Sequence, residues 1–248
     1  MRFQVLTIFP ELFHPFVSTS LVGRAVDKGL LSVEVRDLRD WSPDRHRSVD
    51  DEPYGGGGGM VMTALPWLRA VRALSGDPAP WRILLSPQGR RLDEGKVREL
   101  ATKPDLLLLC GRYEGIDERV HEAVVDEEIS VGDFVLAGGE LPAMVLIEAL
   151  SRQIPGVVQL AESVERDSFR GGLLDFPHYT RPVELEGRRV PDVLMSGDHA
   201  AIEAWREEAA LRSTRAKRPD LLARAQLTAR QRRLLAELER AESSPDLP

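Results

Sequence analysis

Three carboxylates and five consecutive glycines stand close together in DDEPYGGGGGM (50–60), and glycine-rich loops can bind phosphate through backbone N–H groups. A Walker-type loop would also need a lysine and a hydroxyl, but Met60 follows the run and the next lysine is Lys96. A dinucleotide fingerprint that began at Gly55 would need glycine at position 60. The run is therefore not predicted to bind phosphate. Two interpretations stay open: a flexible surface loop, or a loop that faces a substrate and lets it approach the backbone.

Three other loops combine glycine with polar residues, and each follows a predicted strand. They are LLSPQGRRLD (84–93), CGRYEGIDERV (110–120) and EISVGDFVLAGGELPAM (128–144). Loops at the carboxyl ends of parallel strands converge on one edge of a sheet, where ligands bind in open α/β folds. We expect the three loops to form a shared site.

The elements that must position these loops alternate in type along the first half of the chain. Apolar runs predict strands at 3–9, 31–38, 82–85, 106–110 and 128–131. Amphipathic stretches predict helices at 11–28, at 65–74, from about 93, and from 142 towards 153. This alternation predicts an α/β domain with a mostly parallel sheet.

The pattern changes after Pro155 and Gly156. We expect an α/β domain at 1–156, an interdomain linker at 157–182 that contributes to the active site, and a small all-helical domain at 183–248. SGD (196–198) can cap a helix over 200–211, and TARQ (228–231) matches a capping box.

Composition narrows the class of protein. With 42% hydrophobic and 29% charged residues the chain is predicted to be globular, and its one cysteine, Cys110, fits a reducing cytoplasm. No signal peptide or membrane span is predicted. The net charge is -7, yet residues 206–233 carry nine Lys or Arg against three Asp or Glu. That basic stretch is either a solvated helix face or a surface for nucleic acid.

Taken in order, the three loops resemble a known family. Together with DDEPYGGGGGMVM (50–62) before them and DSFRGGLLDFPHYTRP (167–182) and VPDVLMSGDHAAIEAWR (190–206) after them, they are similar to the bacterial tRNA (guanine-N1-)-methyltransferases, over essentially the whole chain. The resemblance implies a SPOUT-class fold, in which a deep trefoil knot holds S-adenosylmethionine. It also implies a homodimer whose active sites draw on both subunits.

The resemblance places the cofactor pocket on small and apolar residues of the three loops, which allow a close approach to the backbone and supply apolar walls. They are Leu85, Ser86, Pro87, Gly89, Gly111, Tyr113, Glu114, Ser130, Val131, Gly132, Asp133, Phe134, Val135, Leu136, Gly138, Gly139 and Pro142. Each glycine could instead serve a turn, and each aromatic residue could serve the core.

The reaction implied is methylation of N1 of the guanosine immediately 3′ of the anticodon, position 37 of tRNA. Guanine N1 carries a proton at neutral pH, so transfer needs a base and a donor that stabilises charge on O6. The family's pair corresponds to Asp167 as base and Arg152 as donor. The alternatives without a catalytic role are a solvated loop carboxylate for Asp167 and a favourable charge near a helix C-terminus for Arg152.

The resemblance further implies a dependence on Mg²⁺, which we connect with Glu114. Asp50, Ser168 and His178 are predicted to read bases of the tRNA anticodon stem-loop, and Arg215 and Arg218 to contact its phosphates. The alternative function is a non-catalytic RNA-binding protein of the same fold.

Overall fold

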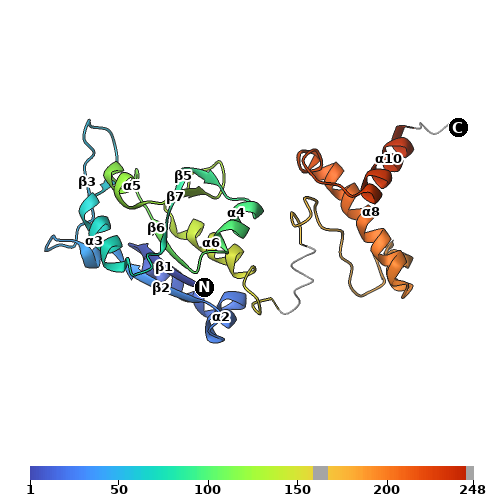
Figure 1. Ribbon diagram of the computed structural model, residues 1–248, viewed down its shortest axis with the longest axis horizontal. Helices are drawn as coiled ribbons and strands as arrows, with labels where there is room; N and C mark the ends of the chain where they lie inside the picture. Colours follow the sequence, from blue (N-terminus) through green and yellow to red (C-terminus); the bar gives the residue numbers. More distant parts are fainter. Residues whose placement is uncertain (159–166, 244–248) are drawn as a thin grey trace. The chain divides into compact units, whose positions relative to one another are not determined.

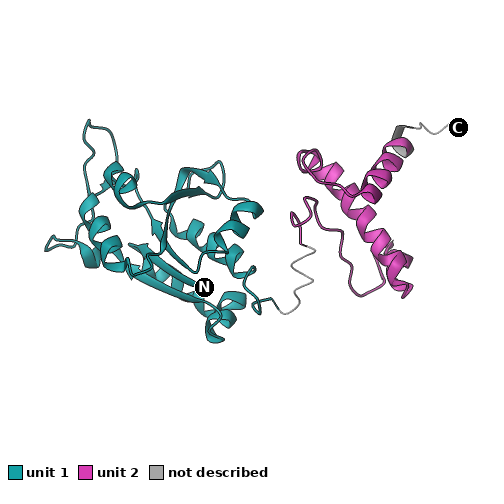
Figure 2. Ribbon diagram, viewed as in Figure 1, with its two compact units in different colours: residues 1–161 teal, residues 162–248 magenta. Residues whose placement is uncertain are grey.

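The computed structural model describes residues 1–158 and 167–243. The chain divides into two compact units, Met1–Ala161 and Glu162–Pro248 (Figure 2). Part of the predicted linker, 159–166, lies outside the described residues, so the boundaries expected from the sequence stay predictions.

A five-stranded sheet forms the centre of unit 1. Its strand order is β2 (Ser32–Asp37), β1 (Arg2–Thr7), β6 (Asp105–Cys110), β5 (Trp81–Arg91) and β7 (Glu127–Ser130), and neighbouring strands are parallel throughout. The predicted α/β class with a parallel sheet is confirmed. Strands β5, β6 and β7 are neighbours, so the loops that follow them leave the same edge of the sheet.

Helices cover both faces of this sheet because its central strands are apolar on both sides. In β6, Leu106 and Leu108 pack into one core cluster and Leu107 and Leu109 into the other, and all four are fully buried. Helices α2 (Ser20–Asp27), α4 (Glu94–Leu100) and α6 (Glu140–Ser151) pack on the first face (Figure 1). Helices α3 (Ala64–Leu74) and α5 (Glu118–Val124) pack on the second.

The predicted helix at 11–28 is wrong as a single element. The structure has a 3₁₀ turn η1 (Pro10–Phe13), a short helix α1 (His14–Ser18), and then α2. The hydroxyls of Ser18 and Thr19 donate to the carbonyls of His14 and Pro15 at 2.8 and 2.6 Å, which satisfies the end of α1. Gly29, with φ +66°, follows α2 as expected.

A short hairpin carries the glycine run. Strands β3 (Asp50–Asp51) and β4 (Val61–Met62) pair antiparallel, with the run between them. A 3₁₀ turn, η2 (Leu38–Trp41), follows β2 and packs against α3. Tyr54, just before the glycines, is fully exposed.

Helices dominate the described part of unit 2. They are α8 (His199–Lys217), α9 (Pro219–Leu222) and α10 (Ala229–Ser243), preceded by a small hairpin of β8 (Glu184–Leu185) and β9 (Arg188–Arg189) and by η3 (Asp192–Met195). Asp198 caps α8, and Thr228 and Gln231 form the predicted capping box before α10. Among the described residues, no helix has the length and apolar character needed to span a membrane.

Candidate functional site

A cavity of about 410 Å³ opens at the carboxyl ends of β5, β6 and β7. Its volume lies within the usual range for small-molecule sites. Its walls come from the three loops that the sequence singled out, so their convergence is confirmed as geometry.

The first wall is an outward bulge of β5. Leu85 and Arg90 both pair with Ile129 of β7, so the four residues between them leave the strand. Gly89 closes this bulge against β7, where a Cβ would lie 2.4 Å from backbone atoms of Glu128 and Ile129. Gly89 therefore shapes the wall by close packing and does not itself line the cavity.

The second wall is the loop after β6, and the glycine-run hairpin holds it. The N–H of Met62 donates to Gly115 O and that of Asp117 donates to Met62 O, both at 2.9 Å. The N–H of Glu114 donates to Met60 O at 3.0 Å, and a Cβ on Gly59 would collide with the Glu114 side chain. The end of the glycine run thus supports the cavity wall, with Tyr113 in a positive-φ conformation.

The third wall is the loop that joins β7 to α6. Ser130 Oγ accepts from the N–H of Gly132 at 3.2 Å and donates to its carbonyl at 2.9 Å, which closes the first turn. Phe134, Val135 and Leu136 follow with exposed fractions of 56%, 84% and 40%. An apolar rim of this kind is unusual on a monomer surface unless something covers it.

The second and third walls are joined by close backbone contact. The N–H of Gly139 donates to Gly111 O at 2.9 Å, and a Cβ on Gly139 would lie 2.7 Å from the Cα of Cys110. A side chain at Gly138 would strike Arg112 and Glu140. At both positions neighbouring atoms leave no room for a side chain, and neither glycine has a positive φ.

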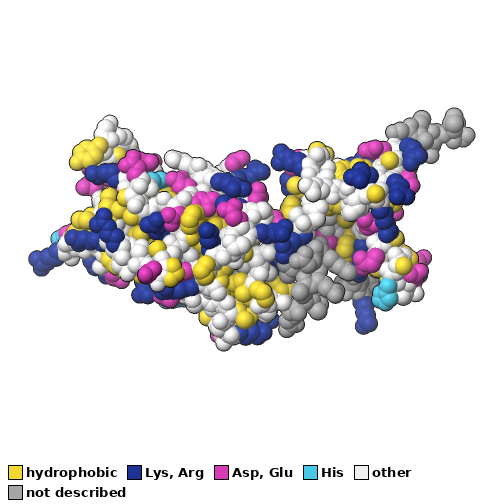
Figure 3. Space-filling model, viewed as in Figure 1, with side chains coloured by type: hydrophobic (Ala, Val, Ile, Leu, Met, Phe, Trp, Pro, Cys, Tyr) yellow, Lys and Arg dark blue, Asp and Glu magenta, His cyan; other side chains and the backbone are white. Residues whose placement is uncertain are grey.

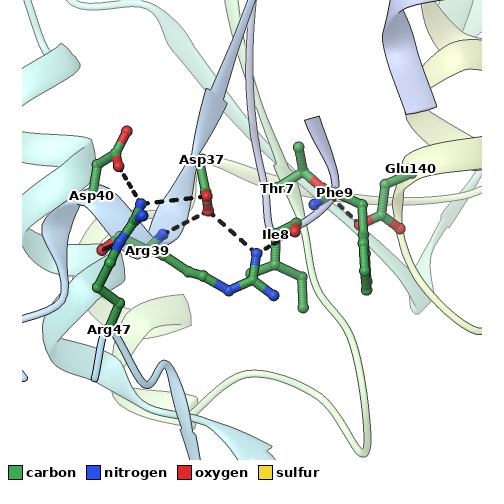
Figure 4. Close-up of polar contacts among 8 residues, drawn as sticks. All are labelled: Thr7, Ile8, Phe9, Asp37, Arg39, Asp40, Arg47 and Glu140. Carbon is green, nitrogen blue, oxygen red and sulfur yellow. Dashed lines mark hydrogen bonds and ion pairs between the residues drawn. The ribbon is translucent and has the colours of Figure 1, made fainter. Parts of the chain in front are cut away.

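A buried carboxylate reinforces this junction. Glu140, at the start of α6 and 1% exposed, accepts from Thr7 Oγ1 at 2.7 Å (Figure 4). It also accepts from Arg112 Nε at 3.2 Å. The Arg112 guanidinium also lies 4.4 Å from the centre of the Phe9 ring. The carboxylate therefore ties β1, the β6 loop and α6 together behind the cavity.

A second polar cluster in Figure 4 braces the end of β2. Asp37 accepts from the Arg39 N–H at 2.9 Å and pairs with Arg47, which also contacts Asp40. Arg39 in turn donates to the carbonyl of Ile8. This cluster fixes the chain after β2 and does not reach the cavity lining.

Burial also determines the pKa of the single cysteine. Cys110, the last residue of β6, is fully buried, and desolvation with the nearby Glu140 charge raises the pKa of its thiol well above the usual value. It is therefore an inert core residue.

The predicted cofactor residues converge, with two exceptions. All of them line the cavity apart from Gly89 and Asp133. Asp133 projects outwards, 89% exposed, with its carboxylate 3.8 Å from Arg91. Asp50 pairs with Met62 in the β3–β4 hairpin and is not part of the lining.

Several lining residues were missed from the sequence, and most belong to the same motifs. They are Leu84, Gln88, Arg112, Gly115, Ile116, Glu118, His121, Ile129 and Ala137. Only His121 lies beyond the motifs; its Nδ1 is 2.5 Å from Glu128 Oε1. It lies three residues after Glu118 on α5, a helical spacing that places both side chains on one face.

The predicted catalytic and RNA-binding residues fall in both units. Arg152 follows the last residue of α6 in unit 1, whereas Asp167, Ser168 and His178 belong to unit 2. His178 Nε2 lies 2.8 Å from Asp175 Oδ2, and Ser168 Oγ accepts from the Asp175 N–H at 3.0 Å.

Four arginines of the basic stretch at 206–233 form described ion pairs. Arg206, Arg212, Arg218 and Arg230 pair with Glu203, Glu208, Asp220 and Glu207 at 2.6–2.9 Å. The Arg218 guanidinium lowers the pKa of the Asp220 carboxyl to about 2. No ion pair joins Lys217, Arg224 or Arg233 to another described residue, and the visible face of unit 2 mixes both signs of charge (Figure 3).

Comparisons with known proteins agree with these features. The family model described as tRNA (Guanine-1)-methyltransferase TrmD matches residues 1–224. A tRNA (guanine-N(1)-)-methyltransferase of Geobacter sulfurreducens is 52% identical over 97% of this chain and 98% of its own length. Relatives with the same description from Halorhodospira halophila and Proteus mirabilis are 53% and 54% identical, over 95% and 96% of this chain and 90% and 96% of their own.

Proposed function

The chain belongs to the tRNA (guanine-1)-methyltransferase family, and we propose that it methylates N1 of the guanosine immediately 3′ of the anticodon, position 37 of tRNA. The chemistry is S-adenosylmethionine-dependent methyl transfer to tRNA guanine. The observation that supports it best is the cavity formed by the three motif loops at the ends of β5, β6 and β7.

The cavity fits the cofactor in size and chemistry. Backbone groups of the glycine-rich loops can bond adenine and ribose edges, and Tyr113, Phe134 and Leu136 offer apolar walls. S-adenosylmethionine, when bound, supplies an electrophilic methyl group on a sulfonium that leaves as a neutral thioether. The chain's own part is to bind it, exclude water and prepare the guanine.

We assign the preparation of guanine to Asp167 and Arg152. Asp167 removes the N1 proton as general base, and Arg152 donates to O6, where negative charge develops. With its proton removed, N1 would present a free lone pair to the methyl group that the bound cofactor would supply. Arg152 belongs to unit 1 and Asp167 to unit 2.

A deep trefoil knot is part of the proposal. Its support in this chain is the tight passage of the 132–139 loop against the end of β6, where Gly139 touches Cys110 and Gly111 backbone atoms. Glycine at that crossing allows one segment to thread past another without a clash.

We also propose a homodimer located in the cytoplasm. The exposed apolar side chains at the cavity rim and on α6, including Val135, Leu141 and Val145, support a second copy as the covering partner. The lone, buried and unreactive Cys110 fits a reducing compartment.

For tRNA recognition we assign base contacts to Asp50, Ser168 and His178, and phosphate contacts to the helical part at 183–248. Arg215 and Arg218 are the phosphate contacts expected from the sequence. We add Lys217, Arg224 and Arg233 as proposed phosphate contacts, since no ion pair with another described residue neutralises their charges.

The magnesium expectation rests on family resemblance alone. Among the described residues, no group of three or more His, Cys, Asp or Glu side chains could hold a metal ion. Glu114 lines the cavity, and it remains the proposed contact if Mg²⁺ takes part. No catalytic step is assigned to the ion.

One assay tests the function. Purified protein is mixed with methyl-labelled S-adenosylmethionine and tRNA transcripts that carry guanosine or adenosine at position 37. We expect label to be incorporated only into the guanosine transcript. Binding of tRNA without incorporation would support the non-catalytic RNA-binding alternative instead.

A further inference from the structure

Helix α8 holds the segment that contains the proposed base, residues 167–179, hereafter the base segment. We propose that Thr214 on α8 is a positioning residue for methyl transfer, because its hydroxyl anchors this segment. The inference rests on the proposed function of Asp167.

Thr214 is unusual in its environment. Only Leu211 and Thr214 are buried along the 19 residues of α8, and Thr214 is fully buried. Its hydroxyl donates to the Ala210 carbonyl at 2.7 Å and accepts from the Leu174 N–H at 2.8 Å. The bond to its own helix fixes the hydroxyl proton, so a lone pair is left facing Leu174.

The bond to Leu174 controls the start of the base segment through a compact turn. The Arg170 N–H donates to Asp167 O at 3.2 Å, and the Phe169 N–H donates to Leu173 O at 2.8 Å. Leu174 comes directly after this closed turn. Anchoring Leu174 therefore restrains Asp167, which lies at the other end of the turn.

The segment then folds back on itself at Asp175. The Asp175 N–H donates to Ser168 Oγ at 3.0 Å, and its carboxylate accepts from the Phe176 N–H and contacts His178, both at 2.8 Å. The proposed base readers Ser168 and His178 are thus linked to the same anchor.

Two further contacts from α8 fall along the segment but are looser. The Arg206 guanidinium lies 4.9 Å from the Phe176 ring centre, and the Trp205 and Tyr179 rings are 6.2 Å apart. Ring contacts of this kind tolerate small shifts, whereas the Thr214 bond is directional and meets the backbone of the segment. The Leu174 N–H is partly buried, and loss of its acceptor would carry a desolvation cost.

This arrangement couples two tasks. Thr214 is followed by Arg215 and Lys217 on the same helix, so residues proposed to contact tRNA phosphates and the proposed base Asp167 belong to the same unit. The position of α8 on the RNA backbone would therefore also set the position of the base segment.

Thr214→Val tests the anchor, since valine keeps the shape and removes the hydroxyl. We expect the single-turnover rate constant with tRNA to fall about tenfold or more, since a smaller fraction of the enzyme holds Asp167 in place. S-adenosylmethionine affinity should not change. Thr214→Ser keeps the acceptor and should restore most of the rate.

Thr228→Val is the matched control. Thr228 Oγ1 also accepts a backbone N–H in unit 2, from Gln231 at 3.2 Å, but it lies at the start of α10, outside α8 and the base segment. We expect it to lower the melting temperature without slowing single-turnover methylation.

Hydrogen exchange provides a readout independent of activity. The Leu174 amide should exchange about tenfold faster in Thr214→Val, with the central amides of α8 unchanged. Unchanged Leu174 exchange, or a normal single-turnover rate in Thr214→Val, would overturn the anchor. A wild-type chain without any methylation would overturn the proposed function, and Leu174 exchange would still decide whether the anchor exists.

Discussion

The cavity wall of unit 1 and the base segment of unit 2 are held in opposite ways. Glycine packing, backbone bonds and the buried Glu140 join the cavity loops at many points. The contacts described for the base segment include individual side-chain hydrogen bonds, those of Thr214 and Asp175. Close backbone packing suits a site that must keep its shape, whereas individual side-chain bonds suit a segment that rearranges around RNA. Mutations in the cavity wall should therefore lower the free energy of unfolding, whereas mutations in the base segment should lower the rate of methyl transfer.

The largest effect is expected for Asp167→Ala. Loss of the general base should reduce single-turnover methylation by about 10²–10⁴-fold and leave S-adenosylmethionine affinity and melting temperature near wild type. Quenched-flow measurement with labelled cofactor gives the rate, and calorimetry gives the affinity. A near-normal rate would remove Asp167 as the base.

Glu140→Ala should show the opposite behaviour. It leaves the Arg112 charge without its buried partner and should lower the free energy of unfolding by about 3 kcal/mol. Urea denaturation measures the change. Glu140→Gln keeps an acceptor for Thr7 and should lose less. An unchanged urea midpoint in the alanine variant would show that the wall is not held by this carboxylate.

Glycine substitutions compare the two regions directly. Gly139→Ala places a Cβ 2.7 Å from the Cys110 Cα, whereas Gly171→Ala meets nothing within 4 Å. We expect the first to cost about 1–3 kcal/mol of stability and to weaken cofactor binding, with the second near neutral. Equal melting temperatures for the two variants would contradict the packing argument.

The wall should also respond to alkaline pH. Burial raises the folded-state pKa of the Cys110 thiol, so the folded state keeps a proton that the unfolded chain loses. Stability from this group is complete below the unfolded pKa near 8.5 and falls above it by up to about 1.4 kcal/mol per pH unit. Cys110→Ala should show a shallower decline between about pH 8.5 and 10. Identical slopes would contradict the expectation.

The smallest effects are expected from single basic residues of unit 2. Lys217→Ala or Arg224→Ala should each reduce the salt slope of tRNA binding by about one. Arg218→Ala should reduce it less, since Asp220 already neutralises part of that charge. Filter binding between about 50 and 200 mM salt measures the salt slope of each variant and tests whether Arg218→Ala changes it least. A larger change for Arg218 would show that RNA displaces Asp220.

Much of the fold followed from periodicity. The run at 106–110 predicted a buried parallel strand, and the run at 82–85 predicted a strand. The capping residues Asp198 and Thr228 marked two helices, because these signals are local. The break between α1 and α2 was missed, since apolar spacing continues through it and the hydroxyls that end α1 compete only weakly.

The sequence by itself determined the five strands of the main sheet, the caps of α8 and α10 and the three motif loops, since each depends on neighbours within a few residues. It also carried the resemblance to the methyltransferase family. Tertiary structure alone decided that the glycine run supports the β6 loop, that Gly138 and Gly139 make room for Arg112 and Cys110, and that Thr214 meets Leu174 across 40 positions. These contacts join residues far apart in the chain, and only folding brings such atoms within hydrogen-bond distance.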